Sequence, residues 1–103
     1  MLLVREIMYA KPGKVRPLVE KFTTMSKMME KAGMGKFRVM TDLCAERYWT
    51  IVAEMEVANL KAFDEMMSGQ GQNAEDMKKM EEVMKGYHDL VESGRREIYK
   101  IEG

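Results

Sequence analysis

The stretch KFRVMTDLCAERYWTIVAEMEV, residues 36–57, carries the clearest pattern in the chain. Apolar and polar residues alternate along it, which is typical of two β-strands that each bury one face. The second half presents one wholly apolar face, made of Trp49, Ile51, Ala53, Met55 and Val57. The equivalent face of the first half carries Phe37, Val39, Thr41 and Leu43. Because directly opposed residues of a hairpin share a face, we expect strands over 36–43 and 47–57 around a short loop over 44–46.

The segment before this hairpin indicates a strand followed by a helix. Residues 2–10 are rich in Leu, Val, Ile, Met and Tyr, and the pair Pro12–Gly13 ends the run. Residues 15–32 carry apolar side chains at spacings of three and four, as on one face of a helix. Gly33 is placed to stop this helix in a left-handed conformation.

The segment after the hairpin predicts a second helix that is broken. Asn59 has a side chain preferred at a helix N-terminus, so we expect a helix from Leu60 to about Ser68. The sequence GQGQN, residues 69–73, then interrupts the apolar pattern. A simple helix break is favoured here over a mobile flap above a cleft.

A third helix and a last strand complete the chain. Asn73 and Asp76 have the spacing of a capping box at the start of the helix. Its apolar stripe consists of Met77, Met80, Met84, Tyr87 and Val91. Gly94 is expected to end the helix, and residues 95–102, RREIYKIE, are expected to form the strand.

This order of elements predicts an α+β fold. Strand, helix, two strands, broken helix and strand form the ferredoxin-like βαββαβ arrangement, with a four-stranded antiparallel sheet in one domain over 1–103. Right-handed connections place the helices on one face of the sheet. The other face is expected to carry Arg38, Met40, Tyr48, Thr50, Val52, Glu54, Glu6 and Met8. This mixture is too apolar for a solvated sheet face, so we expect a homodimer through the open face.

Composition excludes several classes of function. Seventeen basic and seventeen acidic residues cancel, which leaves no electrostatic footprint for nucleic acid or an anionic membrane. Cys44 is the sole cysteine, so an intrachain disulfide is impossible and a reducing compartment is favoured. The apolar run at the N-terminus is too short for a signal peptide or a membrane span. We therefore expect a cytoplasmic protein.

The thirteen methionines are unusually many for 103 residues. Thioether sulfur binds copper(I), but most of these methionines fall on the apolar stripes of the expected helices. Core packing is therefore the favoured interpretation, and we predict neither a metal site nor a cofactor.

Four segments carry a resemblance to a known superfamily: KPGK (11–14), TDL (41–43), WTIVAEMEV (49–57) and ESGRREIYKIE (92–102). In this order they resemble the dimeric α+β barrel superfamily, and in particular the small NIPSNAP-like and antibiotic-biosynthesis-monooxygenase-like proteins. The resemblance implies two sheets that face each other across a two-fold axis, with a cleft beside or within the barrel. Its members include cofactor-free monooxygenases, isomerases, decarboxylases, haem enzymes and ligand-sensing domains. The fold by itself therefore leaves the activity open.

Five residues are candidates for a ligand cleft: Glu6, Arg38, Tyr48, Glu54 and His88. Neighbouring carboxylates of Glu6 and Glu54 could supply a general acid or base, but a structural ion pair of Arg38 with one of them inside a dimer interface is the favoured interpretation. Tyr48 could orient a phenolic substrate. His88, expected on the third helix, could act as acid, base or haem ligand, but a structural role is favoured because no second His lies near it in sequence.

These features support two hypotheses. The first is a small homodimeric α+β-barrel protein of undefined biochemical role that binds an apolar or aromatic metabolite. The alternative is a cofactor-free monooxygenase or isomerase that acts on an aromatic substrate in the barrel cleft. An enclosed pocket with those polar residues on its wall would favour a ligand site, and a filled interior would favour a purely structural role.

Overall fold

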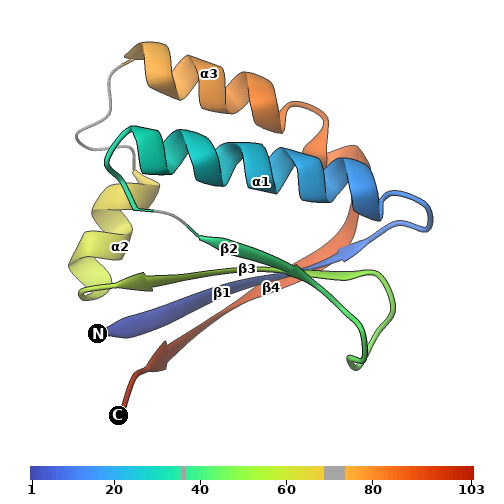
Figure 1. Ribbon diagram of the computed structural model, residues 1–103, viewed down its shortest axis with the longest axis horizontal. Helices are drawn as coiled ribbons and strands as arrows, with labels where there is room; N and C mark the ends of the chain where they lie inside the picture. Colours follow the sequence, from blue (N-terminus) through green and yellow to red (C-terminus); the bar gives the residue numbers. More distant parts are fainter. Residues whose placement is uncertain (36, 69–73) are drawn as a thin grey trace.

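Four antiparallel strands form one sheet in the computed structural model, which describes residues 1–35, 37–68 and 74–103 (Figure 1). The strands are β1 (Leu2–Ala10), β2 (Arg38–Thr41), β3 (Thr50–Val57) and β4 (Val91–Lys100), in the order β2-β3-β1-β4. The first and last strands therefore lie side by side although they are far apart in sequence. This topology confirms the predicted ferredoxin-like α+β fold.

The helices all lie on one side of this sheet (Figure 1). They are α1 (Val15–Lys31), α2 (Leu60–Met67) and α3 (Ala74–Met84), followed by a 3-10 turn, η1 (Tyr87–Asp89). Helix α1 packs on β2 and β3, whereas α3 packs mainly on α1 and makes little direct contact with the sheet. Among the described residues, no helix is both long and apolar enough to cross a membrane.

Helix α1 ends as the sequence predicts. Gly33 has a φ of 77°, and its N–H donates to the carbonyl of Glu30 at 3.1 Å. The N–H of Met34 donates to the carbonyl of Met29 at 2.9 Å. Because only glycine adopts this left-handed backbone without a steric cost, Gly33 determines where the helix stops.

The β2–β3 hairpin has shorter strands and a longer loop than predicted. The strands end at Thr41 and resume at Thr50, so the predicted loop over 44–46 is wrong. The side chain of Asp42 accepts a hydrogen bond from the N–H of Thr50 at 2.8 Å and closes the loop. Trp49 has a positive φ of 58°, which turns the chain just before β3. Trp49 and Leu43 consequently leave the apolar face and are exposed, at 46% and 103%.

The third helix ends earlier than predicted, and the last strand begins earlier. Helix α3 stops at Met84, and Gly86 adopts a left-handed φ of 83°. The ammonium group of Lys21 on α1 donates to the carbonyls of Val83 at 3.1 Å and Lys85 at 2.7 Å, which satisfies the helix end. Gly94 therefore lies within β4 rather than at a helix terminus. The predicted break over 69–73, and with it the Asn73 cap, lies outside the described residues.

Strand β1 faces the opposite way from the prediction. Glu6 pairs with Ala53, and Met8 pairs with Ile51, so both side chains lie on the helix side with the core residues of β3. The placement of Glu6 and Met8 on the open face is therefore wrong. The open face instead receives Leu3, Arg5, Ile7 and Tyr9 from this strand. Imperfect alternation along β1 concealed this, since a shift of one residue exchanges the two faces.

The core consists of two clusters on the helix side of the sheet. The larger one surrounds Leu18 and Ile51, which are both fully buried, and it joins α1 to β1 and β3. The smaller one surrounds Val4 and joins the start of β1 and the end of β3 to Phe63 on α2. Asn59 caps α2 as predicted, because its side chain accepts from the N–H of Ala62 at 2.8 Å.

Candidate functional site

A cavity of about 370 Å³ lies where the two core clusters meet, between the sheet and the helices. Eight of the sixteen residues that line it are methionines: Met25, Met29, Met34, Met55, Met66, Met67, Met80 and Met84. Its aromatic lining residues are Phe22, Phe37, Phe63 and Tyr87. The position of α3 accounts for this cavity. Because α3 packs on α1 rather than on the sheet, it does not cover the neighbouring parts of β1 and β4.

Three aromatic rings, one in contact with the other two, form the wall of the cavity on the α1 side. The ring of Phe22 lies edge-on to Phe37, with centroids 6.3 Å apart, and to Tyr87, with centroids 6.2 Å apart. The hydroxyl of Ser26 donates to the carbonyl of Phe37 at 2.7 Å and accepts from its N–H at 3.1 Å. These contacts hold the start of β2, and with it the ring of Phe37, against α1.

One ion pair provides the polar part of the cavity wall. Glu6 and Arg96 are directly opposed on β1 and β4, and the Nε of Arg96 donates to Glu6. Among the described residues they are the only charged side chains that line the cavity. The side chains of Glu6 and Arg96 are 34% and 42% exposed, so solvent reaches the pair. The guanidinium carbon of Arg96 also lies 5.1 Å from the ring centroid of Phe63, within cation–π range.

A polar hollow of about 400 Å³ adjoins the cavity at this ion pair. The two spaces share Glu6, Tyr87 and Arg96. His88 lines the polar hollow from η1, and its ring lies against Tyr87 with centroids 4.4 Å apart. The ion pair and Tyr87 thus lie between an apolar interior and a polar opening.

The five residues predicted for a cleft do not form one site. Glu6 lines the cavity, and His88 joins it at the polar hollow from η1 rather than from the third helix. Arg38 and Glu54 form an ion pair on the opposite, open face of the sheet. Tyr48 lies in the β2–β3 loop and is 81% exposed. The structure therefore separates this set into two pairs and one isolated residue.

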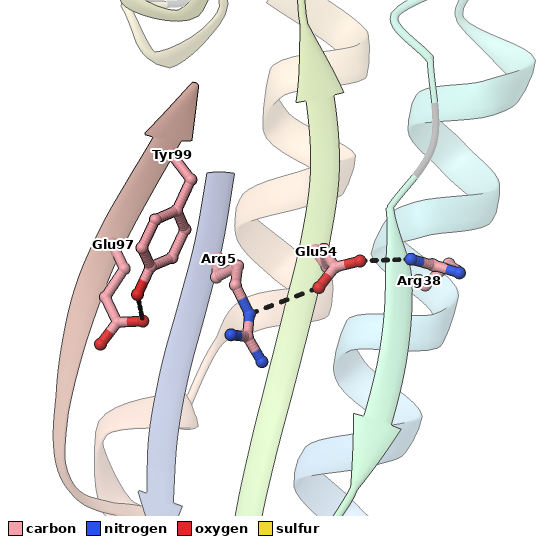
Figure 2. A network of polar contacts seen from close by, with 5 residues as sticks. All are labelled: Arg5, Arg38, Glu54, Glu97 and Tyr99. Carbon is pink, nitrogen blue, oxygen red and sulfur yellow. Dashed lines mark hydrogen bonds and ion pairs between the residues drawn. The ribbon is translucent and has the colours of Figure 1, made fainter. Parts of the chain in front are cut away.

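The open face of the sheet carries a row of charged side chains across its strands (Figure 2). Glu54 lies between two arginines, because one carboxylate oxygen accepts from Arg38 and the other lies 3.3 Å from the Nε of Arg5. The Glu54 side chain is only 11% exposed, so these contacts compensate the cost of burying its charge. The Nε of Arg5 is buried and makes no hydrogen bond with the described residues.

A second group on this face shifts three pKa values. The hydrogen bond from the Tyr99 hydroxyl at 2.6 Å, followed by the one from Arg95 at 2.8 Å, lowers the pKa of Glu97. The same carboxylate raises the pKa of Tyr99 above its ordinary value of 10.0. Glu97, followed by Tyr9, raises the pKa of Arg95. Figure 2 shows the contact between Glu97 and Tyr99.

Sequence reasoning missed Arg96 and the methionine lining of the cavity. The alternation of Arg96 and Ile98 along β4 was a usable signal, because it places both on one face of a strand. That this face of β4 lies opposite Glu6 of β1, however, can be known only from the register of the two strands. Most of the methionines were correctly placed on helix stripes, but no stripe indicates that its side chains surround a hollow.

In the described parts of the chain, no group of three or more His, Cys, Asp or Glu side chains converges in a way that could hold an ion. Cys44 is exposed in the β2–β3 loop, away from the cavity.

Known structures share this fold over almost their whole length. A NIPSNAP-like domain protein from Burkholderia xenovorans matches 98% of this chain and 84% of its own, with a TM-score of 0.76 and 12% identity. A NIPSNAP family protein from Agrobacterium tumefaciens matches 97% and 92%, with a TM-score of 0.70 and 13% identity. A protein described as an antibiotic biosynthesis monooxygenase matches 100% of both chains, with a TM-score of 0.71 and 10% identity.

No family model and no curated protein matches the sequence. The structural likenesses confirm the resemblance at the level of the fold. At 10–13% identity they do not transfer an activity.

Proposed function

We propose that this ferredoxin-like protein, a structural neighbour of NIPSNAP-like and monooxygenase-like proteins, binds a small apolar or aromatic molecule between its sheet and its helices. The observation that carries the proposal is the cavity of about 370 Å³ with eight methionines and one ion pair on its wall. A space of this size falls in the range of roughly 300–1,000 Å³ that is usual for small-molecule sites.

The chemistry of the lining supports an apolar ligand. Methionine side chains are flexible and polarisable, so they adapt to ligands of different outline and make favourable contacts with aromatic rings. Aromatic rings on the α1 side offer edges and faces for stacking. A single pair, Glu6–Arg96, is available to orient a polar substituent.

A cavity-filling variant tests the proposal. Met84→Trp on α3 should occupy part of the space, whereas Lys78→Trp places the same ring on the exposed side of that helix. A thermal-shift screen with aromatic acids and quinones should identify compounds that raise the melting temperature of the wild type and of Lys78→Trp but not of Met84→Trp. A ligand at 100 times its Kd should add about 2.7 kcal/mol of stability. If no compound shifts the wild type, or if both variants bind equally, the cavity is not a ligand site.

Glu6 favours a second candidate function, a cofactor-free monooxygenase or isomerase with an aromatic substrate. Such reactions begin with removal of a proton, and Glu6 is the one carboxylate on the described cavity wall. Glu6→Gln should then abolish turnover of any ligand found in the screen, measured as oxygen uptake or isomer formation, while affinity for that ligand changes little. Turnover that survives this substitution would exclude Glu6 as the base.

We further propose that two copies associate through the open sheet face. That face combines ion pairs that already compensate one another with side chains that are largely apolar and only partly covered within the single chain: Leu3, Met40, Val52 and Tyr99. A second sheet packed about 10 Å away would cover them.

Sedimentation velocity at micromolar concentration tests this association. Val52→Asp should yield a single-chain particle, because it places a new charge at the centre of the face. Leu60→Asp adds the same charge to the exposed side of α2, where Leu60 is 62% exposed, and should leave the dimer intact. A wild type that sediments as a single chain would refute the association.

A further inference from the structure

We infer that the ligand is an elongated amphiphile, with a planar anionic head such as a carboxylate at Arg96 and an apolar tail that runs along the methionines of α2 and α3. This inference rests on the proposed function, because it specifies the class of molecule that occupies the same cavity. Three observations carry it: the adjacency of three hollows, the change of polarity along them, and the unused donors of Arg96.

Three hollows lie next to one another in space, with the central cavity in the middle. The central cavity shares Glu6, Tyr87 and Arg96 with the polar hollow. At its other end it adjoins a hollow of about 270 Å³ beside α2 and α3. These two spaces share five methionines: Met25, Met66, Met67, Met80 and Met84. Because neighbouring hollows share their lining residues, the inferred ligand extends from η1 and β4, past the ion pair, into the hollow beside α2 and α3.

The polarity of the lining changes along the three hollows. The end near β4 is lined by further polar residues in addition to the ion pair: His88, Glu92, Ser93 and Arg95, of which Arg95 already donates to Glu97 and Tyr9. The far hollow has eight lining residues, of which six are methionines and two, Ser68 and Glu81, are polar. A flat aromatic molecule would use the central cavity alone. An extended molecule with one polar end matches the whole length.

Arg96 favours an anionic head over a cationic one. Its Nε donates to Glu6, and no other hydrogen bond of its guanidinium is formed with the described residues. The two terminal nitrogens can therefore receive both oxygens of a carboxylate in the fork geometry that arginine prefers. A cationic head could reach only the Oε2 of Glu6, since Oε1 already accepts from Arg96, whereas a carboxylate can be held by two nitrogens of Arg96. Glu92, the other carboxylate of the polar hollow, already has a partner in Arg47 at 3.5 Å.

Methionines suit an apolar tail because flexible thioethers adapt to a chain that has no fixed shape. Each methylene that enters the hollows should raise affinity about fourfold. Affinity should therefore depend on chain length as well as on the head group.

Matched ligands and methionine probes test the inference. The full chain, labelled with [methyl-¹³C]methionine, is titrated by NMR with decanoate, hexanoate, decan-1-ol and decylamine below their aggregation limits. Decanoate should bind roughly 10² times more tightly than hexanoate, as four methylenes predict, and at least about tenfold more tightly than the alcohol or the amine. Signals of Met25, Met66, Met77 and Met80 should shift, whereas that of Met40 on the open face should not.

Two variants isolate the head contact. Arg96→Gln should weaken decanoate about tenfold and leave decan-1-ol unchanged, whereas Lys100→Gln, which removes an exposed charge from the same strand, should alter neither. Should Arg96→Gln fail to fold, the wild-type comparison of head groups still decides the matter.

The possible results separate the inference from the function on which it rests. The inference of an amphiphilic ligand would be refuted by any of three results. These are that decan-1-ol or decylamine binds as tightly as decanoate, that affinity does not depend on chain length, or that only the Met40 signal shifts. If aromatic compounds bind and decyl compounds do not, the inference fails and the proposed function stands. If neither class binds, both fail.

Discussion

The contact between Ser26 and Phe37 should be a principal attachment of α1 to the sheet. Ser26 is only 9% exposed, and its hydroxyl bonds both the N–H and the carbonyl of Phe37. Phe37 immediately precedes β2 and lines the cavity. Ser26→Ala removes both hydrogen bonds and leaves two part-buried backbone groups without their partner.

The expected loss is about 1.5 kcal/mol of unfolding free energy. Each hydrogen bond contributes about 1 kcal/mol net. Against this loss, alanine favours the helix by about 0.5 kcal/mol relative to serine. For a domain of this size, the melting temperature should fall by about 6–12 °C. Thr24→Ala is the matched control, because Thr24 is exposed on the same helix and its substitution should stabilise by only a few tenths of a kcal/mol.

Urea unfolding at one fixed protein concentration, followed by circular dichroism, measures these differences. Hydrogen exchange at the Phe37 amide adds a local readout, since its protection should fall in Ser26→Ala and stay unchanged in Thr24→Ala. A stability within about 0.3 kcal/mol of the wild type, with unchanged protection of that amide, would refute the role assigned to Ser26.

Three further results are expected. Gly94→Ala should destabilise by about 1–3 kcal/mol in urea, because a Cβ there would lie 2.9 Å from the backbone carbonyl of Ile7; Ser93→Ala, its exposed neighbour, should not. Folding lowers the pKa of Glu97, so its interactions stabilise the fold at neutral pH and are lost as the pH falls below the ordinary value of 4.5. In Glu97→Gln, the melting temperature should therefore fall less steeply than in the wild type as the pH is lowered below 4.5. Ultraviolet titration should show Tyr99 ionising above pH 10.0 in the wild type and closer to it in Glu97→Gln; identical curves would contradict the contact.

Local features of the sequence determined the element order and several boundaries. The alternation across the hairpin, the stop at Gly33 and the cap at Asn59 each follow from interactions within a few residues along the chain. The central part of the apolar hairpin face, Ile51 opposite Thr41 and Ala53 opposite Val39, could be predicted for the same reason.

The end of α3 could not be predicted from periodicity. Apolar residues continue at helical spacing from Met84 through Tyr87 to Val91, but the later ones pack against the sheet from η1 and β4 instead. The contact that satisfies the helix end comes from Lys21, which lies more than sixty residues earlier.

Tertiary structure alone decided the candidate site. Glu6 and Arg96 are ninety residues apart, and they meet only because β1 pairs with β4 in one register. The methionines of three helices surround a cavity only because α3 packs on α1 instead of on the sheet. Caps, turns and alternation depend on neighbours along the chain and can be inferred from it. Registers and hollows depend on which distant surfaces come into contact, and a single sequence does not specify those pairs.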